Sequence, residues 1–194
     1  YIKIDENNEE HMKIGDEIKD FMEKLFPDPE LRKYMWEFLA AILIGHNDNQ
    51  TFHFFLGVGS NGKSLLIELL EKCLGDYKGT APLTMITGNR TREGQATPEI
   101  VSLRGKRLAV LQEAKKNTVL NEGTFKEYTG CDSITGRPLY GSKMITFKPQ
   151  FNMLLCTNYL PTITSTDNGT WRRIRVVDFE SRFEDNPNSP EFEH

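Results

Sequence analysis

Cysteine, histidine and long apolar runs are scarce in this sequence of 194 residues. The three cysteines, Cys73, Cys131 and Cys156, are far apart, and no two have the spacing of metal ligands. Their odd number argues against a framework of disulfides, so we expect three buried free thiols in a reducing, intracellular setting. The four histidines are isolated from one another. The sequence therefore favours no metal site built from cysteine or histidine.

The chain also lacks a membrane-spanning stretch and an excess of positive charge. The longest apolar run, Phe38 to Ile44, is far too short to cross a bilayer, and no N-terminal signal pattern is present, so we expect no membrane partner. The net charge of −4 gives no sign of nucleic-acid binding, although a local basic cluster can bind phosphates in an acidic protein. Because the first residue is Tyr1 rather than methionine, we expect a piece of a longer protein.

Short apolar strands alternate with amphipathic helices along most of the chain. The strands are rich in β-branched and aromatic residues, whereas the helices repeat apolar residues at helical spacing. This alternation predicts an α/β fold, a three-layer sandwich with a mostly parallel central sheet. We expect strands at 51–56, 107–112, 151–156 and 174–179, helices at 13–26, 29–44, 63–74 and 121–129, loops around a short element at 76–98, and a hairpin of 134–140 and 143–148 around a two-residue Gly141-Ser142 turn.

The most specific motif is the sequence GVGSNGKS at residues 57–64, which matches the phosphate-binding loop of P-loop NTPases at every required position. A predicted strand precedes it and a predicted helix follows it, as the motif requires. Backbone amides of such a loop surround phosphates, and the helix directs its positive dipole end at them. The expected nucleotide-binding residues are Gly57, Gly59, Ser60, Asn61, Gly62, Lys63 and Ser64, with Lys63 on the β- and γ-phosphates of ATP and the Ser64 hydroxyl on Mg²⁺.

Two polar residues at strand ends are candidates for the hydrolytic step. Glu113 can anchor Mg²⁺ and polarise the attacking water, although it stands alone because Gln112 precedes it where a first acid is often found. Asn158 can orient that water or sense the γ-phosphate. The residues alone leave simpler interpretations open: Glu113 as a polar strand end, and Asn158 as a turn former before Pro161.

A basic cluster follows a tryptophan near the end of the chain. It contains Arg172, Arg173 and Arg175. An arginine next to a γ-phosphate stabilises the charge of the transition state. The alternative is a solvated basic surface, which is the commoner role of a run of charges.

Taken together and in order, these segments resemble the superfamily three helicases. The greatest likeness is to the C-terminal helicase part of poxvirus-type and phage- or plasmid-type primase–helicases. The resemblance covers roughly residues 25–183. It is carried by residues 57–64, 97–99, 103–107 with Glu113, 125–130 with Asp132, 137–140, 147–149, 158–161, and 171–173 with Phe179.

The resemblance implies a role for each matching residue. Lys63 and Ser64 match the Walker A motif, Glu113 the Walker B acid, and Asn158 the sensor of motif C. Arg172 or Arg173 matches the arginine finger, which in this family acts on the ATP of the neighbouring subunit, and we prefer Arg173.

The family also implies a hairpin that reaches into a central channel. This hairpin makes Lys143 and Tyr140 candidates for a phosphate contact and a base contact with single-stranded DNA. An exposed hairpin tip with an ordinary surface lysine is the alternative.

Three segments are expected: an N-terminal helical segment at 1–48, the P-loop ATPase domain at 49–183, and a tail or linker at 184–194. The resemblance and its position suggest the helical segment as part of a ring-forming collar. The family implies an ATP-driven DNA helicase of a virus or mobile element that works as a homo-oligomeric ring, with a hexamer expected and a primase domain upstream. Its setting would be intracellular, in the host cytoplasm or at a site of viral replication.

Two rivals to the helicase remain. One is a nucleotide-binding switch for assembly or loading that does not unwind DNA, which the absence of net basic charge and the missing first acid favour. The other is a small-molecule kinase, which the order of the later motifs and the absence of an obvious lid sequence disfavour.

Overall fold

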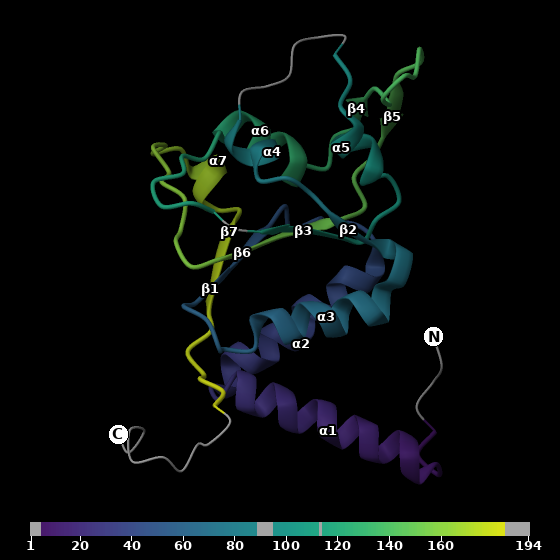
Figure 1. Ribbon diagram of the computed structural model, residues 1–194, viewed down its shortest axis with the longest axis vertical. Helices are drawn as coiled ribbons and strands as arrows, with labels where there is room; N and C mark the ends of the chain where they lie inside the picture. Colours follow the sequence, from purple (N-terminus) through teal and green to yellow (C-terminus); the bar gives the residue numbers. More distant parts are fainter. Residues whose placement is uncertain (1–4, 89–94, 113, 185–194) are drawn as a thin grey trace.

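Five parallel strands form the central sheet of the computed structural model, which describes residues 5–88, 95–112 and 114–184 (Figure 1). The strand order is β2-β3-β6-β1-β7, and every neighbouring pair is parallel, which confirms the predicted sheet. The strands are β1 (Phe52–Leu56), β2 (Lys78–Thr80), β3 (Leu108–Gln112), β6 (Asn152–Thr157) and β7 (Ile174–Asp178).

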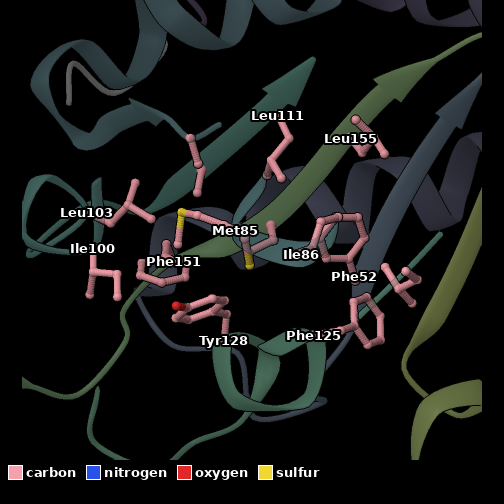
Figure 2. Packing of buried hydrophobic residues seen from close by; sticks show 14 of the residues in the cluster. Phe52, Met85, Ile86, Ile100, Leu103, Leu111, Phe125, Tyr128, Phe151 and Leu155 are labelled. Carbon is pink, nitrogen blue, oxygen red and sulfur yellow. The ribbon is translucent and has the colours of Figure 1, made fainter. Parts of the chain in front are cut away.

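Helices cover both faces of the sheet and complete the predicted three-layer sandwich (Figure 1). On one face lie α1 (Glu9–Leu25), α2 (Pro29–Ile44) and α3 (Lys63–Leu74), which pack with Phe55 and Val110. On the other face lie α4 (Thr84–Thr87), α5 (Pro98–Ser102) and α6 (Glu122–Thr129). Figure 2 shows Phe125 and Tyr128 of α6 directed at sheet residues such as Phe52. Burial on both faces explains why the inner strands β1, β3 and β6 are mainly apolar.

Local signals determine the ends of the N-terminal helices. Asp28 caps α2 by accepting a hydrogen bond from the backbone N–H of Glu30 at 2.9 Å, as its place before Pro29 predicted. Gly45 ends α2 in the left-handed region with φ of 84°. A side chain there would collide with Arg107, whose guanidinium donates to the carbonyl of Ile44 at 2.8 Å.

Several elements differ from the sequence expectations. The first helix begins at Glu9 rather than residue 13, because Asn8 caps it. The sheet strand β2 and the short helix α7 (Asn168–Trp171) were not predicted, nor was the 3₁₀ turn Gly75–Tyr77. The hairpin consists of β4 (Ile134–Gly136) and β5 (Ile145–Phe147), so residues 137–144 connect them and the predicted two-residue turn is wrong. The chain reverses earlier, where the N–H of Gly141 donates to the carbonyl of Pro138 at 3.1 Å.

The N-terminal helices are built into the same core as the sheet. Met22, Phe26 and Phe38 belong to one buried cluster with β1 and β6 residues, and the boundary predicted at residue 48 stays a prediction. Among the described residues, no helix is long and apolar enough to span a membrane. The cysteines are free as predicted, but they are not fully buried: Cys73 is exposed on α3, and Cys131 and Cys156 are partly exposed.

Candidate nucleotide site

The phosphate loop connects the end of β1 to the start of α3, as the sequence predicted. Its backbone takes conformations that favour glycine, with φ of 154° at Gly57 and 78° at Gly62. A Cβ atom at Gly57 would lie 2.1 Å from the Asn61 amide nitrogen, and one at Gly62 would lie 2.6 Å from a Leu25 methyl. The glycines are therefore required both by the turn and by the atoms packed around it.

Lys63 is held inside this loop. Its side-chain ammonium donates to the carbonyl of Gly57 at 2.5 Å and to the side-chain oxygen of Asn61 at 3.0 Å. Asn61 in turn donates to the carbonyl of Phe179 at 3.4 Å. Burial lowers the pKa of Lys63 from its usual value, while nearby Cys156 acts in the opposite direction. The arrangement places a cation, backbone amides and a helix N-terminus around one point, which is the chemistry of a phosphate site.

A cavity of about 570 Å³ opens beside the loop at the carboxyl edge of the sheet. It brings together Lys63, Ser64 and Asn158, which the sequence had predicted to meet. The Thr157 hydroxyl fixes the turn that carries Asn158 by accepting from the Tyr159 N–H at 3.2 Å and donating to the Tyr159 carbonyl at 2.8 Å. The predicted Walker B acid, Glu113, lies outside the described residues.

Other residues of this cavity were not predicted from the sequence. Glu68 and Glu71 project from α3, and Cys156 lies at the end of β6. Burial raises the pKa of the Cys156 thiol to about 11, so it is a neutral thiol at physiological pH. A neutral thiol is neither an effective nucleophile nor a metal ligand. Among the described residues, no group of three or more acidic, histidine or cysteine side chains could hold a metal ion by itself.

A second cavity, of about 490 Å³, adjoins the first and shares Lys63, Ser64 and Asn158 with it. Residues 59–65 and Asn158 line it, together with the rings of Phe21 and Phe183. The segment after β7 crosses the loop here: the N–H of Phe183 donates to the carbonyl of Ser60 at 2.7 Å, and the Ser181 hydroxyl donates to the Lys24 carbonyl at 2.7 Å. Sequence reasoning missed Phe21 and Phe183, because only the fold brings α1 and the C-terminal segment to the loop.

The arginine pair lies at the opposite edge of the sheet from the loop. Ile174, which follows the pair, is in register with Phe52 at the start of β1, whereas the loop follows the end of β1. The Arg172 side chain is exposed, while Arg173 is 9% exposed and donates to the Gly169 carbonyl. The structure therefore does not bring either arginine to the Lys63 of its own chain.

The hairpin side chains proposed for DNA are also remote from the loop. The connection between β4 and β5 projects beyond α5 (Figure 1). Tyr140 at its turn is 98% exposed with φ of 61°, and Lys143 is exposed. Both side chains are therefore accessible to a ligand.

A family model matches residues 55–173, which run from the end of β1 through the phosphate loop to the arginine pair. The chain belongs to the family DUF5906. Its description is a family of unknown function. The match therefore identifies a set of relatives and leaves the activity to be argued from the site.

This DUF5906 chain is similar to proteins of large DNA viruses. A protein named putative helicase from Acanthamoeba polyphaga mimivirus is 40% identical over 183 residues, covering 94% of this chain and 18% of that protein. A protein named putative helicase from Frog virus 3 is 38% identical over 166 residues, which cover 84% of this chain and 17% of that protein. A protein named putative primase from African swine fever virus is 28% identical over 167 residues, which cover 86% of this chain and 17% of that protein. This chain thus spans less than a fifth of these relatives.

Solved structures share the fold of this DUF5906 chain. The NrS-1 C-terminal region matches with a TM-score of 0.64 at 19% identity, over 87% of this chain and 38% of that one. The JCV helicase matches with a TM-score of 0.51 at 15% identity, over 87% of this chain and 46% of that one. Together with the viral relatives, these matches confirm the resemblance to the helicase part of viral primase–helicases and the P-loop α/β fold.

Proposed function

We propose that this chain is the ATP-driven motor of a viral or mobile-element replicative helicase that moves along single-stranded DNA. The observation that carries the proposal is the convergence of Lys63, Ser64 and Asn158 on one cavity at the carboxyl edge of a parallel sheet. This edge is where open α/β sheets bind ligands. The names of the viral relatives and the order of the motifs support a helicase over other P-loop enzymes.

The loop geometry suggests how ATP would bind. The amides of residues 59–62 would surround the phosphates, and Lys63 would exchange its bonds to Gly57 and Asn61 for the β- and γ-phosphate oxygens. Mg²⁺ fits the site because it needs few protein ligands and keeps several waters. The hydroxyl of Ser64, an exposed residue, would be one ligand. Glu113 is proposed as the acid that anchors Mg²⁺, either directly or through a water molecule.

Asn158 is proposed to orient the attacking water. It borders both cavities, as do Lys63 and Ser64. An amide offers both a donor and an acceptor, which suits it to orient water against a phosphate. Bound Mg²⁺ would supply charge neutralisation on the phosphate oxygens.

The second cavity is a suitable place for the base of the nucleotide. It is adjacent to the phosphate loop and is bordered by two aromatic rings, Phe21 and Phe183. Aromatic rings stack on bases with little regard to base identity. We therefore propose that the nucleoside part of ATP lies against these rings.

The remote arginines and hairpin suit a ring of identical subunits, with a hexamer expected. Because Arg172 and Arg173 cannot serve their own chain's loop, an arginine would complete the site of the neighbouring subunit. The hairpin with Tyr140 and Lys143 would contact single-stranded DNA in the channel. An upstream primase domain in the same protein and an intracellular site of viral DNA copying complete the proposal.

An ATPase assay with and without single-stranded DNA tests the proposal. Turnover should rise when single-stranded DNA is added, and Lys63→Ala should abolish it while the thermal melting profile stays that of the wild type. Tight nucleotide binding without DNA stimulation would favour the loading switch instead. Undiminished turnover in Lys63→Ala would end the assignment of the loop as the catalytic site.

A further inference from the structure

Gln50 belongs to none of the motifs that carry the resemblance, yet it contacts both arginines of the pair. Its side-chain oxygen accepts hydrogen bonds from the guanidinium of Arg172 and from that of Arg173, the latter at 2.9 Å. The residue lies in the loop before β1 with φ of 54°, an uncommon backbone conformation for a side chain of this kind. One neutral amide therefore joins two neighbouring cations.

The two arginines differ in what else holds them. Arg173 is buried and also donates to the carbonyl of Gly169, so its side chain is committed to the interior of its own subunit. Burial, and then the charge of Arg172, lower the pKa of Arg173 from its usual value. Arg172 is exposed, and its guanidinium is bonded to Gln50. This difference favours Arg172, not the preferred Arg173, as the arginine that can reach another subunit.

Gln50 is itself anchored from two sides. Its backbone N–H donates to the carbonyl of Asn47 at 2.8 Å, and its side-chain amide nitrogen lies 3.7 Å from the sulfur of Cys131, which follows α6. Asn47 braces the same loop by bonding both the N–H and the carbonyl of Thr51, at 3.1 and 2.8 Å. The amide oxygen of Gln50 is thus held in a fixed direction.

A neutral acceptor suits this position. A carboxylate would hold Arg172 in an ion pair and compete with a phosphate for it, whereas an amide oxygen orients a guanidinium and leaves its charge available. An apolar side chain would leave Arg172 free to rotate. Gln50 meets both requirements.

We propose that Gln50 is a positioning residue that directs Arg172 out of its subunit towards the nucleotide of the next one, with Arg173 as the internal support. This inference rests on the proposed ATPase function. It adds a residue that acts through Arg172 and not on the nucleotide of its own chain. Loss of Gln50 should therefore damage the neighbouring site and spare its own.

Subunit mixing in the full-length protein tests this separation. Gln50→Met removes the acceptor and keeps the side-chain length, and we expect kcat for DNA-stimulated ATP hydrolysis to fall about 100-fold, the scale of a misplaced catalytic group, with nucleotide binding unchanged. Arg172→Ala should behave alike. Gln150→Met, the same change at an exposed glutamine, should retain wild-type turnover.

The decisive measurement mixes each variant with Lys63→Ala subunits. An interface that takes its loop from a Gln50→Met subunit and its arginine from a Lys63→Ala subunit is intact, so the mixture should exceed both parents, as should the mixture with Arg172→Ala. Gain with Arg172→Ala but none with Gln50→Met would overturn the positioning role and leave the proposed function standing. Full activity of Arg172→Ala, or no gain in its mixture, would overturn the role of Arg172 at a shared site and with it this inference.

Discussion

At the scale of single residues, the most unusual environment is that of His53 on β1. The side chain is 2% exposed, lies 3.8 Å from the Phe38 ring between centroids, and shares a 2.7 Å hydrogen bond with the Tyr34 hydroxyl. Arg175 is its register partner on β7. Burial, and then the charge of Arg175, lower the pKa of His53 to about 3.

This pKa makes the stability of the fold depend on pH. The folded state keeps His53 neutral, while the unfolded chain takes up a proton as the pH falls below about 6.5, so stability is fully present above that pH and is lost as the pH falls towards 3. We expect His53 to lower the free energy of unfolding by about 2 kcal/mol between pH 7 and pH 5. Urea titrations at both pH values should show this loss in the wild type.

The matched variant is His53→Gln, whose amide can replace the ring nitrogen that meets Tyr34. Its free energy of unfolding should change less between pH 7 and pH 5 than that of the wild type. Equal pH dependence in the two proteins would show that other groups control acid stability.

Phe183 provides a second test at this scale, because it borders the second cavity, where the base is proposed to lie, and is not among the residues that line the first. Phe183→Ala should raise KM for ATP about 10-fold, the scale of a lost stacking contact. Binding of inorganic triphosphate should be unchanged, since triphosphate has no base. Phe183→Leu keeps an apolar contact, so its KM for ATP should lie between those of the wild type and Phe183→Ala. Equal weakening of ATP binding and triphosphate binding would show that the substitution damages the phosphate loop instead.

At the scale of elements, the β4–β5 hairpin is the part whose proposed role is most separable from nucleotide chemistry. Lys143→Ala should weaken single-stranded DNA binding and lower the slope of log K against log salt by about 0.7, as expected for one lost phosphate contact. Basal ATP hydrolysis without DNA should stay at the wild-type rate. The measurement is a fluorescence-anisotropy titration at several salt concentrations.

Lys33→Ala is the matched control for this experiment, because Lys33 is an exposed lysine on α2, on the other side of the sheet. It should leave DNA affinity and its salt dependence unchanged. An equal loss in both variants would indicate diffuse electrostatic attraction and not a hairpin contact.

The elements also show what a sequence can predict. Strands β1, β3 and β6 were predictable because they are buried on both faces and hence mainly apolar. Strand β7 lies at the sheet edge and is partly exposed, and its β-branched residues made it predictable. Strand β2 has the sequence Lys-Gly-Thr, without an apolar signal, and it exists because β3 offers it a partner. The two strands of the hairpin were predicted too long and its turn too short. Residues 137–144 contain several turn-forming residues, and no local rule selects among them.

At the scale of the whole molecule, the phosphate loop was predictable and its surroundings were not. The loop is a local motif with fixed spacing, and parallel strand ends share one edge, so Lys63, Ser64 and Asn158 were expected to meet. Phe21 and Phe183 come from opposite ends of the chain, and their meeting depends on how α1 packs. No sequence motif pointed to Gln50, because its proposed role arises only from the contacts with Arg172 and Arg173 that the fold creates.

The central claim is that ATP hydrolysis at the phosphate loop drives movement on DNA. A strand-displacement assay on a forked duplex tests it most directly, using full-length wild-type protein and Lys63→Ala with Mg²⁺ and ATP. The account predicts displacement by the wild type that requires hydrolysable ATP and is absent in Lys63→Ala. ATP hydrolysis that proceeds beside an intact duplex, or displacement that Lys63→Ala performs equally well, would contradict it.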